Sequence, residues 1–284
     1  MSSKAGSASR FMAKESAIIG IDEWLTTPPG RYLVAWEQAQ LDRLVSNIFG
    51  YHAVQLGWPA VQGLRCNRMR HRWLVNDGPL NAGLAASAPA PVDGAAIWPP
   101  GPLPLSVMSD YETLPFPSAS LDLVVLPHTL ELAGDAHQTL REVERVLMPE
   151  GRVVVIGFNP ASLWGAYQAS ADVAGRLGWG SGPVSSGTEL IGWRRLRDWL
   201  RLLGLEFESG RFGCYRPPFA TERWLERCAW FDDAGSRWWP VLGSAYVLVA
   251  VKRVRAMRLM GPAWRKKTQG ATVPAAVARH HHEP

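Results

Sequence analysis

The chain has 284 residues, of which 47% are hydrophobic and 19% charged, and this composition predicts an ordinary globular protein with room for a sizeable core. Its net charge of +5 is unevenly distributed, because residues 252–284 contain eight basic side chains and one acidic side chain, whereas the rest contains 22 basic and 24 acidic ones. The slightly acidic body argues against nucleic acid as the main partner, although the basic end can add weak attraction to RNA or anionic lipid.

Cysteine usage and hydropathy indicate in which cellular compartment the protein is expected. Cys66, Cys214 and Cys228 stand far apart, with no C-x-x-C pair, which predicts reduced thiols and argues against a disulfide framework or a zinc site. The sequence shows no hydrophobic signal core near its start and no apolar run long enough to cross a membrane. We therefore expect a cytoplasmic protein without a transmembrane segment or a bound metal.

The first third of the chain alternates unpatterned and periodic stretches. Residues 1–20 are rich in Ser, Ala, Gly and Lys and are expected to be flexible. From Arg31 onward, apolar residues at helical spacing predict a helix whose polar face carries Glu37. Its apolar stripe comprises Leu33, Val34, Leu41, Leu44, Val45 and Ile48. Residues 79–104 are rich in Ala, Pro and Gly and predict a long, poorly structured insertion.

The stretch around which the chain is organised runs from residue 105 to residue 159. Three apolar runs, LSVM (105–108), LDLVVL (121–126) and RVVVIGF (152–158), lack polar alternation, which is typical of strands covered on both faces. Residues 138–148 place apolar side chains at helical spacing, and the Pro-Glu-Gly that follows is expected to end this helix. Together these elements predict a parallel crossover unit, whose ligands bind at the carboxyl ends of the strands.

The order of these motifs resembles that of class I S-adenosylmethionine-dependent methyltransferases, type 11 branch. The residues that carry the resemblance are Asp110, Leu114-Pro115-Phe116, Leu121-Asp122-Leu123-Val124, His128, and Leu140-Arg141-Glu142-Val143 through Gly151. The resemblance implies an α/β fold, namely a Rossmann-like, doubly wound sheet of seven strands with an antiparallel last strand. It further implies a single domain over residues 21–255 and S-adenosyl-L-methionine as the cofactor.

The resemblance also implies which residues contact the cofactor. In this family an acid after the third strand approaches the adenine amino group and the next residue's amide meets a ring nitrogen, which implies Asp110 and Tyr111. An acid that ends the second strand pairs with the ribose hydroxyls, which implies Asp77, although its Asn-Asp-Gly context is also that of a plain turn. Pro127 and His128, which follow the fourth strand, are implied as walls of the methionine pocket.

The first strand departs from the family pattern, which has an acidic residue followed by G-x-G-x-G. Gly50-Tyr51-His52 is the best positional match to this loop and implies Gly50 and Tyr51 as cofactor contacts, yet it brings side chains where the family has almost none. Alternatively, AVQLG is the strand and the loop is Gly57-Trp58-Pro59, which is no better a glycine-rich loop. Either the cofactor's amino-acid end is held differently, or this half of the pocket has decayed.

The C-terminal half completes the expected sheet. Residues 193–203 predict an amphipathic helix, and residues 205–210 predict the sixth strand. An inserted helix is expected within residues 216–232, and the last strand over residues 246–254. Residues 256–284 are expected to form a basic, flexible tail.

Three functional hypotheses follow. The first is a methyltransferase acting on a small or lipid-like acceptor; its cofactor is already activated, so a base is needed only if the acceptor must lose a proton. His128, His52 and Glu131 are the candidates for that base by position. The second is a catalytically inactive relative with a regulatory or scaffold role, which the degenerate glycine loop motivates. The third is an RNA methyltransferase recruited by the basic tail, against which the acidic body argues.

Overall fold

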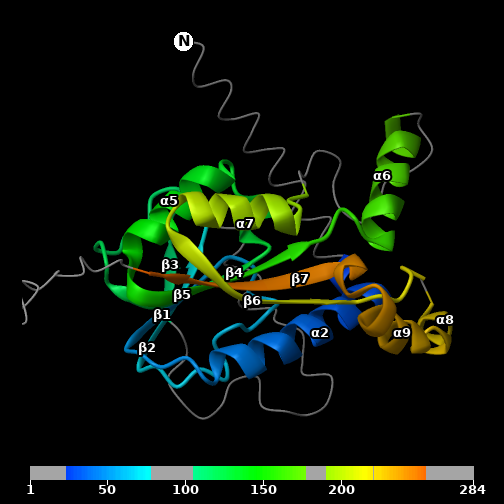
Figure 1. Ribbon diagram of the computed structural model, residues 1–284, viewed down its shortest axis with the longest axis horizontal. Helices are drawn as coiled ribbons and strands as arrows, with labels where there is room; N and C mark the ends of the chain where they lie inside the picture. Colours follow the sequence, from blue (N-terminus) through cyan, green and yellow to red (C-terminus); the bar gives the residue numbers. More distant parts are fainter. Residues whose placement is uncertain (1–23, 78–104, 177–189, 220, 254–284) are drawn as a thin grey trace, which may run out of the picture. The chain divides into compact units, whose positions relative to one another are not determined.

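A computed structural model of the chain describes residues 24–77, 105–176, 190–219 and 221–253 (Figure 1). The expected flexible start, the Pro-rich insertion and the basic tail all lie outside the described residues. Among the helices that are described, none is both long and apolar enough to cross a bilayer.

Seven strands form one sheet in the order β3-β2-β1-β4-β5-β7-β6. The strands are β1 (His52–Leu56), β2 (His71–Asn76), β3 (Leu105–Met108), β4 (Leu121–Pro127), β5 (Leu147–Phe158), β6 (Leu205–Gly213) and β7 (Ala245–Lys252). β1 to β5 pair in parallel, whereas β7 runs antiparallel to both β5 and β6. The expected seven-stranded sheet with an antiparallel last strand is therefore confirmed.

Helices cover both faces of this sheet. They are α2 (Pro28–Val45), α4 (Thr129–Leu132), α5 (Ala136–Val146), α6 (Leu163–Arg176), α7 (Trp193–Leu202), α8 (Glu222–Arg227) and α9 (Trp230–Trp238), with a 3-10 turn η1 (Pro240–Leu242). Figure 1 shows α5 and α7 on one face and α2 on the other. Val124 and Leu126 of β4 pack on the face covered by α5 and α7, and Leu123 and Val125 pack on the face covered by α2. This double burial explains why the strand sequences are continuously apolar.

The joint between α5 and β5 differs from the expectation. The helix ends at Val146 instead of Met148, and β5 starts at once, with Leu147 opposite Leu121. The Pro-Glu-Gly sequence therefore lies inside the strand, where Glu150 takes a left-handed φ of 65°. The register with β4 shifts at this point, because Leu121 pairs with Leu147 and Leu123 with Arg152, so the break-forming sequence lies in an irregular part of the strand.

The connection between β1 and β2 contains turns and no helix. The buried amide of Gln55 organises it, because Nε2 donates to the carbonyls of Gly57, Trp58 and Val61 and Oε1 accepts from the amide of Gly63. These bonds satisfy backbone groups that a helix would otherwise satisfy internally. The loop after β1 therefore does not open a helix whose N-terminus could face a ligand.

Candidate active site

The carboxyl ends of β1, β2 and β3 lie side by side and are tied together by hydrogen bonds. The amide of Gly57 donates to the carbonyl of Val75 over 2.7 Å, and the amide of Ser109 donates to that of Asn76 over 2.9 Å. The amide of Asp77 donates to the Tyr111 hydroxyl over 3.3 Å. In parallel sheets this edge is where ligands bind.

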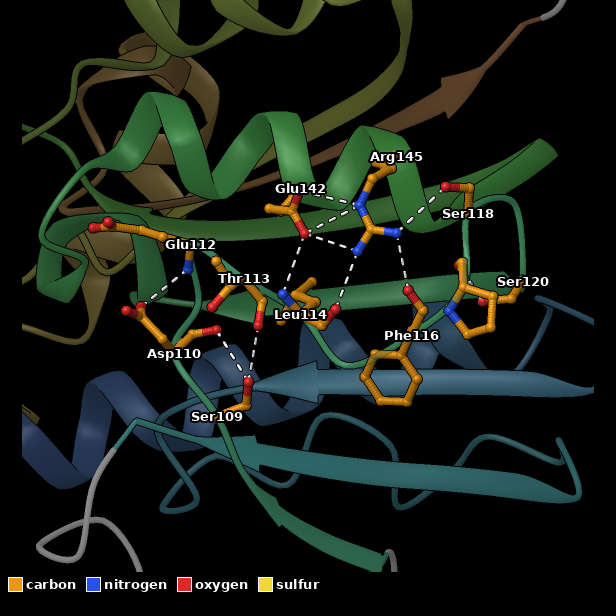
Figure 2. A network of polar contacts seen from close by, with 11 residues as sticks. Ser109, Asp110, Glu112, Thr113, Leu114, Phe116, Ser118, Ser120, Glu142 and Arg145 are labelled. Atoms are coloured by element: carbon orange, nitrogen blue, oxygen red, sulfur yellow. Dashed lines mark hydrogen bonds and ion pairs between the residues drawn. The ribbon is translucent and has the colours of Figure 1, made fainter.

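The loop after β3, residues 109–120, is clamped by two side chains of α5 (Figure 2). Arg145 donates to the carbonyls of Leu114 and Phe116 over 3.1 and 3.0 Å and pairs with Glu142 over 2.8 Å. Glu142 in turn accepts from the amide of Leu114 over 3.2 Å. The hydrogen bonds from Arg145 hold the pKa of Glu142 below its usual range, so the clamp stays ionised. The LPF motif of the loop and the LREVERVL motif of α5 are thus in direct contact with each other.

Asp110 and Tyr111 begin this loop and point in different directions. Asp110 is exposed, and its Oδ1 accepts from the amide of Glu112 over 3.1 Å, as Figure 2 shows. Tyr111 is buried, and its hydroxyl lies against Gly57. The side chain of Asn76 nearby is fully buried, and both its polar atoms lack a hydrogen-bond partner. Polar groups from three strands therefore converge at this edge.

The loop after β1 is compact and strained. Gly57 and Trp58 have φ values of 68° and 35°, a left-handed conformation that is costly for tryptophan. The Trp58 indole is 4% exposed, its Nε1 has no partner, and its ring centroid lies 4.2 Å from that of His128. Such an outlier is a signal of function.

His128 is the centre of a buried ionic cluster. It follows β4 directly, with a φ of 53°, and is 1% exposed. Its Nε2 lies 2.8 Å from Glu37 Oε1 of α2, and its Nδ1 lies 2.8 Å from Glu131 Oε2 of α4. The other oxygen of Glu131 accepts from the amide of Phe158 over 2.7 Å, and the centroid of the tilted Phe158 ring lies 4.2 Å from that of the imidazole. The cluster therefore fixes the end of β5.

The cluster holds its histidine protonated. Burial lowers the pKa of His128, but the charges of Glu37 and Glu131 outweigh it and raise this pKa to about 9. Burial raises the pKa of Glu131, opposed by the imidazolium beside it. Because both ring nitrogens of His128 already face carboxylates, neither is available to accept a proton from a substrate. The geometry therefore does not favour His128 or Glu131 as the base that their sequence position suggested.

Three of the sequence-based assignments are wrong because they mistook one end of β1 for the other. Gly50 and Tyr51 precede β1, and His52 is its first residue, so all three lie at the amino edge of the sheet. There the amides of Tyr51 and His52 donate to Asp122 over 2.8 and 2.9 Å. The alternative in which AVQLG forms the strand is the one observed. Pro127, by contrast, ends β4 at the carboxyl edge, next to His128.

The sequence also gave no indication of Glu37. The helical pattern places it with the polar residues of α2, yet the structure buries it completely, with Oε2 left unpartnered. Its burial depends on His128, 91 residues further along the chain, and no local pattern encodes such a contact. Among the described residues, no group of three or more His, Cys, Asp or Glu side chains is arranged to hold a metal ion.

A pocket opens beside this cluster, at the carboxyl end of β5. Eight residues line it: Trp24, Phe158, Asn159, Trp164, Gly165, Gln168, Leu190 and Ser244. None of them has an ionisable side chain, and three are aromatic. The rings of Trp24 and Trp164 meet edge to face at 5.5 Å, and Phe158 separates the pocket from His128. A second pocket lies behind the β1–β2 loop, and neither pocket is lined by Asp77 or Asp110.

Comparison with known proteins agrees with this architecture. The model of a family described as a methyltransferase domain matches residues 94–155. An uncharacterized protein of Escherichia coli K12, YafS, is 27% identical over 196 residues, which is 69% of this chain and 70% of that protein. The ubiquinone/menaquinone biosynthesis C-methyltransferase UbiE of Hahella chejuensis is 43% identical over 53 residues, which is 19% of this chain and 21% of that enzyme.

Among solved structures, an S-adenosylmethionine-dependent methyltransferase of Thermotoga maritima, described as a possible histamine N-methyltransferase, superposes with a TM-score of 0.56. The likeness covers 86% of this chain and all of that one at 14% identity, so it concerns the fold. The fold and the family match together define a class I S-adenosylmethionine-dependent methyltransferase. Within that class the matching family model, which spans residues 94–155, is that of the type 11 branch. This result does not favour the alternative of a catalytically inactive relative.

Proposed function

We propose that this methyltransferase acts on a small, uncharged or lipid-like acceptor, which binds in the pocket beside Phe158. The single observation that carries the proposal is the lining of that pocket, which presents aromatic rings and no ionisable side chain. Such a surface favours an apolar, neutral ligand, because a charged one would lose its hydration without gaining an ion pair. The partial match to an enzyme named for quinone biosynthesis supports the same acceptor class.

The cofactor expected of this family is S-adenosylmethionine, and the residues at the carboxyl edge suit its adenosyl part. In our proposal Asp77 accepts from the ribose hydroxyls, and Asp110 and the amide of Tyr111 contact the adenine edge. The buried side chain of Asn76, which has unpartnered donor and acceptor atoms, indicates that this edge is built for a polar ligand. The cofactor supplies an activated methyl group, and the protein supplies orientation and exclusion of water.

The amino-acid part of the cofactor meets a different environment. Trp58 stands where the family has glycine, and residues 57–70 offer no helix N-terminus. The charged cluster behind Trp58 contains the unpartnered Oε2 of Glu37. In our proposal Glu37, His128 and Glu131 orient Phe158 and Trp58, and none of the three transfers a proton.

Calorimetric titration with S-adenosylmethionine and with its demethylated product tests the cofactor site. We expect replacement of Asp110 by Ala to weaken binding about tenfold, which is the loss of one good hydrogen bond to a charged group. Asp198→Ala on the exposed face of α7 is the matched control and should bind normally. Equal binding by the Asp110 and Asp198 variants would remove the adenine assignment.

Transfer of a labelled methyl group tests the acceptor site. The enzyme, incubated with labelled cofactor and a cell extract, should place the label in the fraction that partitions into organic solvent. Trp24→Ala, which removes one aromatic wall, should reduce transfer and leave cofactor binding unchanged. Label found only in water-soluble, charged products would contradict an apolar acceptor.

A further inference from the structure

The segment between β6 and β7 carries a concentrated set of exposed apolar side chains. Fourteen large hydrophobic residues are exposed in the described part of the chain, and seven of them fall within residues 219–242. They are Phe219, Trp224, Trp230, Trp238, Trp239, Val241 and Leu242, with exposed fractions of 40% to 71%. We call these seven residues the aromatic surface. Such a concentration of exposed apolar side chains in one segment is typical of an interaction site.

The composition of the aromatic surface favours a lipid bilayer over a protein. Four of its seven members are tryptophans, whose amphipathic rings prefer the boundary between headgroups and acyl chains. Arg223, Arg227 and Arg237 are exposed among them, and the guanidinium of Arg227 lies 5.3 Å from the ring centroid of Trp224. Arginine beside tryptophan suits this boundary, since its aliphatic stem lies along apolar surface while its charge stays in water.

Residues 219–242 contain three arginines and the four acids Glu222, Glu226, Asp232 and Asp233, and two of these acids are paired with arginines outside the segment, which leaves a small positive excess. Asp232 pairs with Arg216 over 2.7 Å and accepts from the amide of Tyr215 over 3.2 Å, so it is engaged within the protein. Glu222 lies 3.8 Å from Arg31 of α2. These contacts compensate two of the acidic residues near the exposed arginines. The same chain also contains residues 252–284, whose eight basic side chains and one acid add attraction to anionic lipids.

The aromatic surface adjoins the acceptor pocket. The side-chain amide of Asn159, a pocket residue, donates to the carbonyls of Val241 and Gly243 over 2.8 and 2.9 Å. Ser244, the next residue, lines the pocket itself. In Figure 1, α8 and α9 project together beyond the end of β7 where this strand begins. A surface resting on a bilayer there would place the pocket mouth close to the membrane.

We propose that the aromatic surface docks the enzyme on anionic membranes, so that a lipid-like acceptor enters the pocket directly from the bilayer. The inference rests on the proposed function for the nature of the acceptor. The helices involved are only six and nine residues long, so the contact is peripheral and reversible.

Co-sedimentation of the full chain with vesicles of phosphatidylcholine and phosphatidylglycerol tests the proposal. We expect the unmodified protein to bind, and the combined variant Trp230→Ala, Trp238→Ala and Trp239→Ala to bind at least about tenfold more weakly, because membrane affinity follows the apolar area inserted. Phe49→Ala combined with Tyr51→Ala is the matched control. These residues are 75% and 73% exposed but lie at the amino edge of the sheet, so this variant should bind normally.

A second measurement covers the case in which the triple variant folds poorly. Brominated phosphatidylcholine should quench the tryptophan fluorescence of the unmodified protein, and vesicles without bromine should not. No quenching, no vesicle binding, or equal binding by the triple variant would each overturn the proposal. So would a dimer that the triple variant converts to a monomer while neither form binds vesicles, since the aromatic surface would then be a contact between two copies.

Vesicle binding needs neither cofactor nor turnover, which separates this inference from the proposed function. Normal vesicle binding together with methyl transfer to a charged, water-soluble acceptor would defeat the proposed acceptor and leave the membrane contact standing. Normal cofactor binding and transfer to an apolar acceptor, without vesicle binding, would defeat only the membrane contact.

Discussion

The loops after β3 and after β1 lie at the same edge of the sheet but are built in opposite ways. The loop after β3 follows the family pattern and is held from outside by Glu142 and Arg145, which remain partly exposed. The loop after β1 abandons the glycine pattern and is held from inside, by the buried amide of Gln55 and by Trp58 against His128. The loop after β3 is thus held by a partly exposed ion pair, whereas the loop after β1 is held next to a buried ionic cluster.

This difference predicts how the stability of each loop responds to salt and to the loss of one side chain. A half-exposed ion pair contributes little on its own and can be weakened by salt. A buried cluster of charges depends on every member, because the loss of one leaves the others unpaired in a medium of low dielectric constant. The two loops should therefore respond very differently to the removal of one side chain.

The largest effect is expected at Glu37, which anchors the buried half. Replacement by Ala leaves the His128 imidazolium with one carboxylate and opens a cavity, so the free energy of unfolding should fall by about 3–5 kcal/mol. Glu37→Gln keeps an acceptor for Nε2 and should cost less. Urea denaturation of both variants measures the difference; a loss below about 1 kcal/mol for Glu37→Ala would mean that the cluster is not a unit.

The next effect is expected at Gly57, where the buried loop comes closest to β3. An added Cβ would lie 2.6 Å from the Tyr111 hydroxyl, and the φ of 68° strains any other residue, so Gly57→Ala should cost about 2 kcal/mol. In a Tyr111→Phe background the clash with the hydroxyl disappears and the cost should fall, while the backbone strain remains. A double-mutant cycle of unfolding free energies checks this coupling, and strict additivity would exclude the contact.

A smaller effect is expected at Arg145 in the clamped half. Arg145→Ala removes the bonds to the carbonyls of Leu114 and Phe116, and because the pair is partly solvated we expect a loss of about 1–2 kcal/mol. Cofactor affinity, measured by calorimetry, should fall with it, since Asp110 belongs to the same loop. Arg152→Ala is the matched control, as Arg152 is equally exposed and pairs with Glu208 on β6. Equal cofactor affinities in the two variants would separate the clamp from the site.

A further effect, which no substitution is needed to observe, is a dependence of stability on pH. The pKa of His128 is raised to about 9 in the folded protein from 6.5, so its contribution to stability is complete below about pH 6.5 and is lost as pH rises through about 9. The melting temperature of the unmodified protein should therefore fall between pH 7 and pH 9.5 more steeply than that of His128→Gln. Parallel curves would show that the histidine is not held as the cation.

The elements of the clamped half could be predicted from the sequence because their signals are local. Asp110 and the LPF motif lie in one contiguous stretch with the helix that follows, and the strands around them are apolar on both faces, but the contacts of Arg145 and Glu142 with the loop came only from the structure. The buried half could not be foreseen in the same way. Glu37 looks like any polar residue of an amphipathic helix, and the two possible positions of β1 differ by only a few residues around a polar Gln55. Burial there is decided by contacts between distant segments, which periodicity does not record.

The link between α2 and the end of β4 also has consequences for motion. A helix that shares an ionic contact with a strand tip cannot swing away without exposing charge, so local opening of α2 should be coupled to loosening of Phe158. Backbone amides near Glu37 and the amide of Phe158 would then exchange with deuterium at a common rate. The pocket lined by Phe158 would then open and close together with α2, so that a ligand or surface that contacts α2 would change the rate at which this pocket opens.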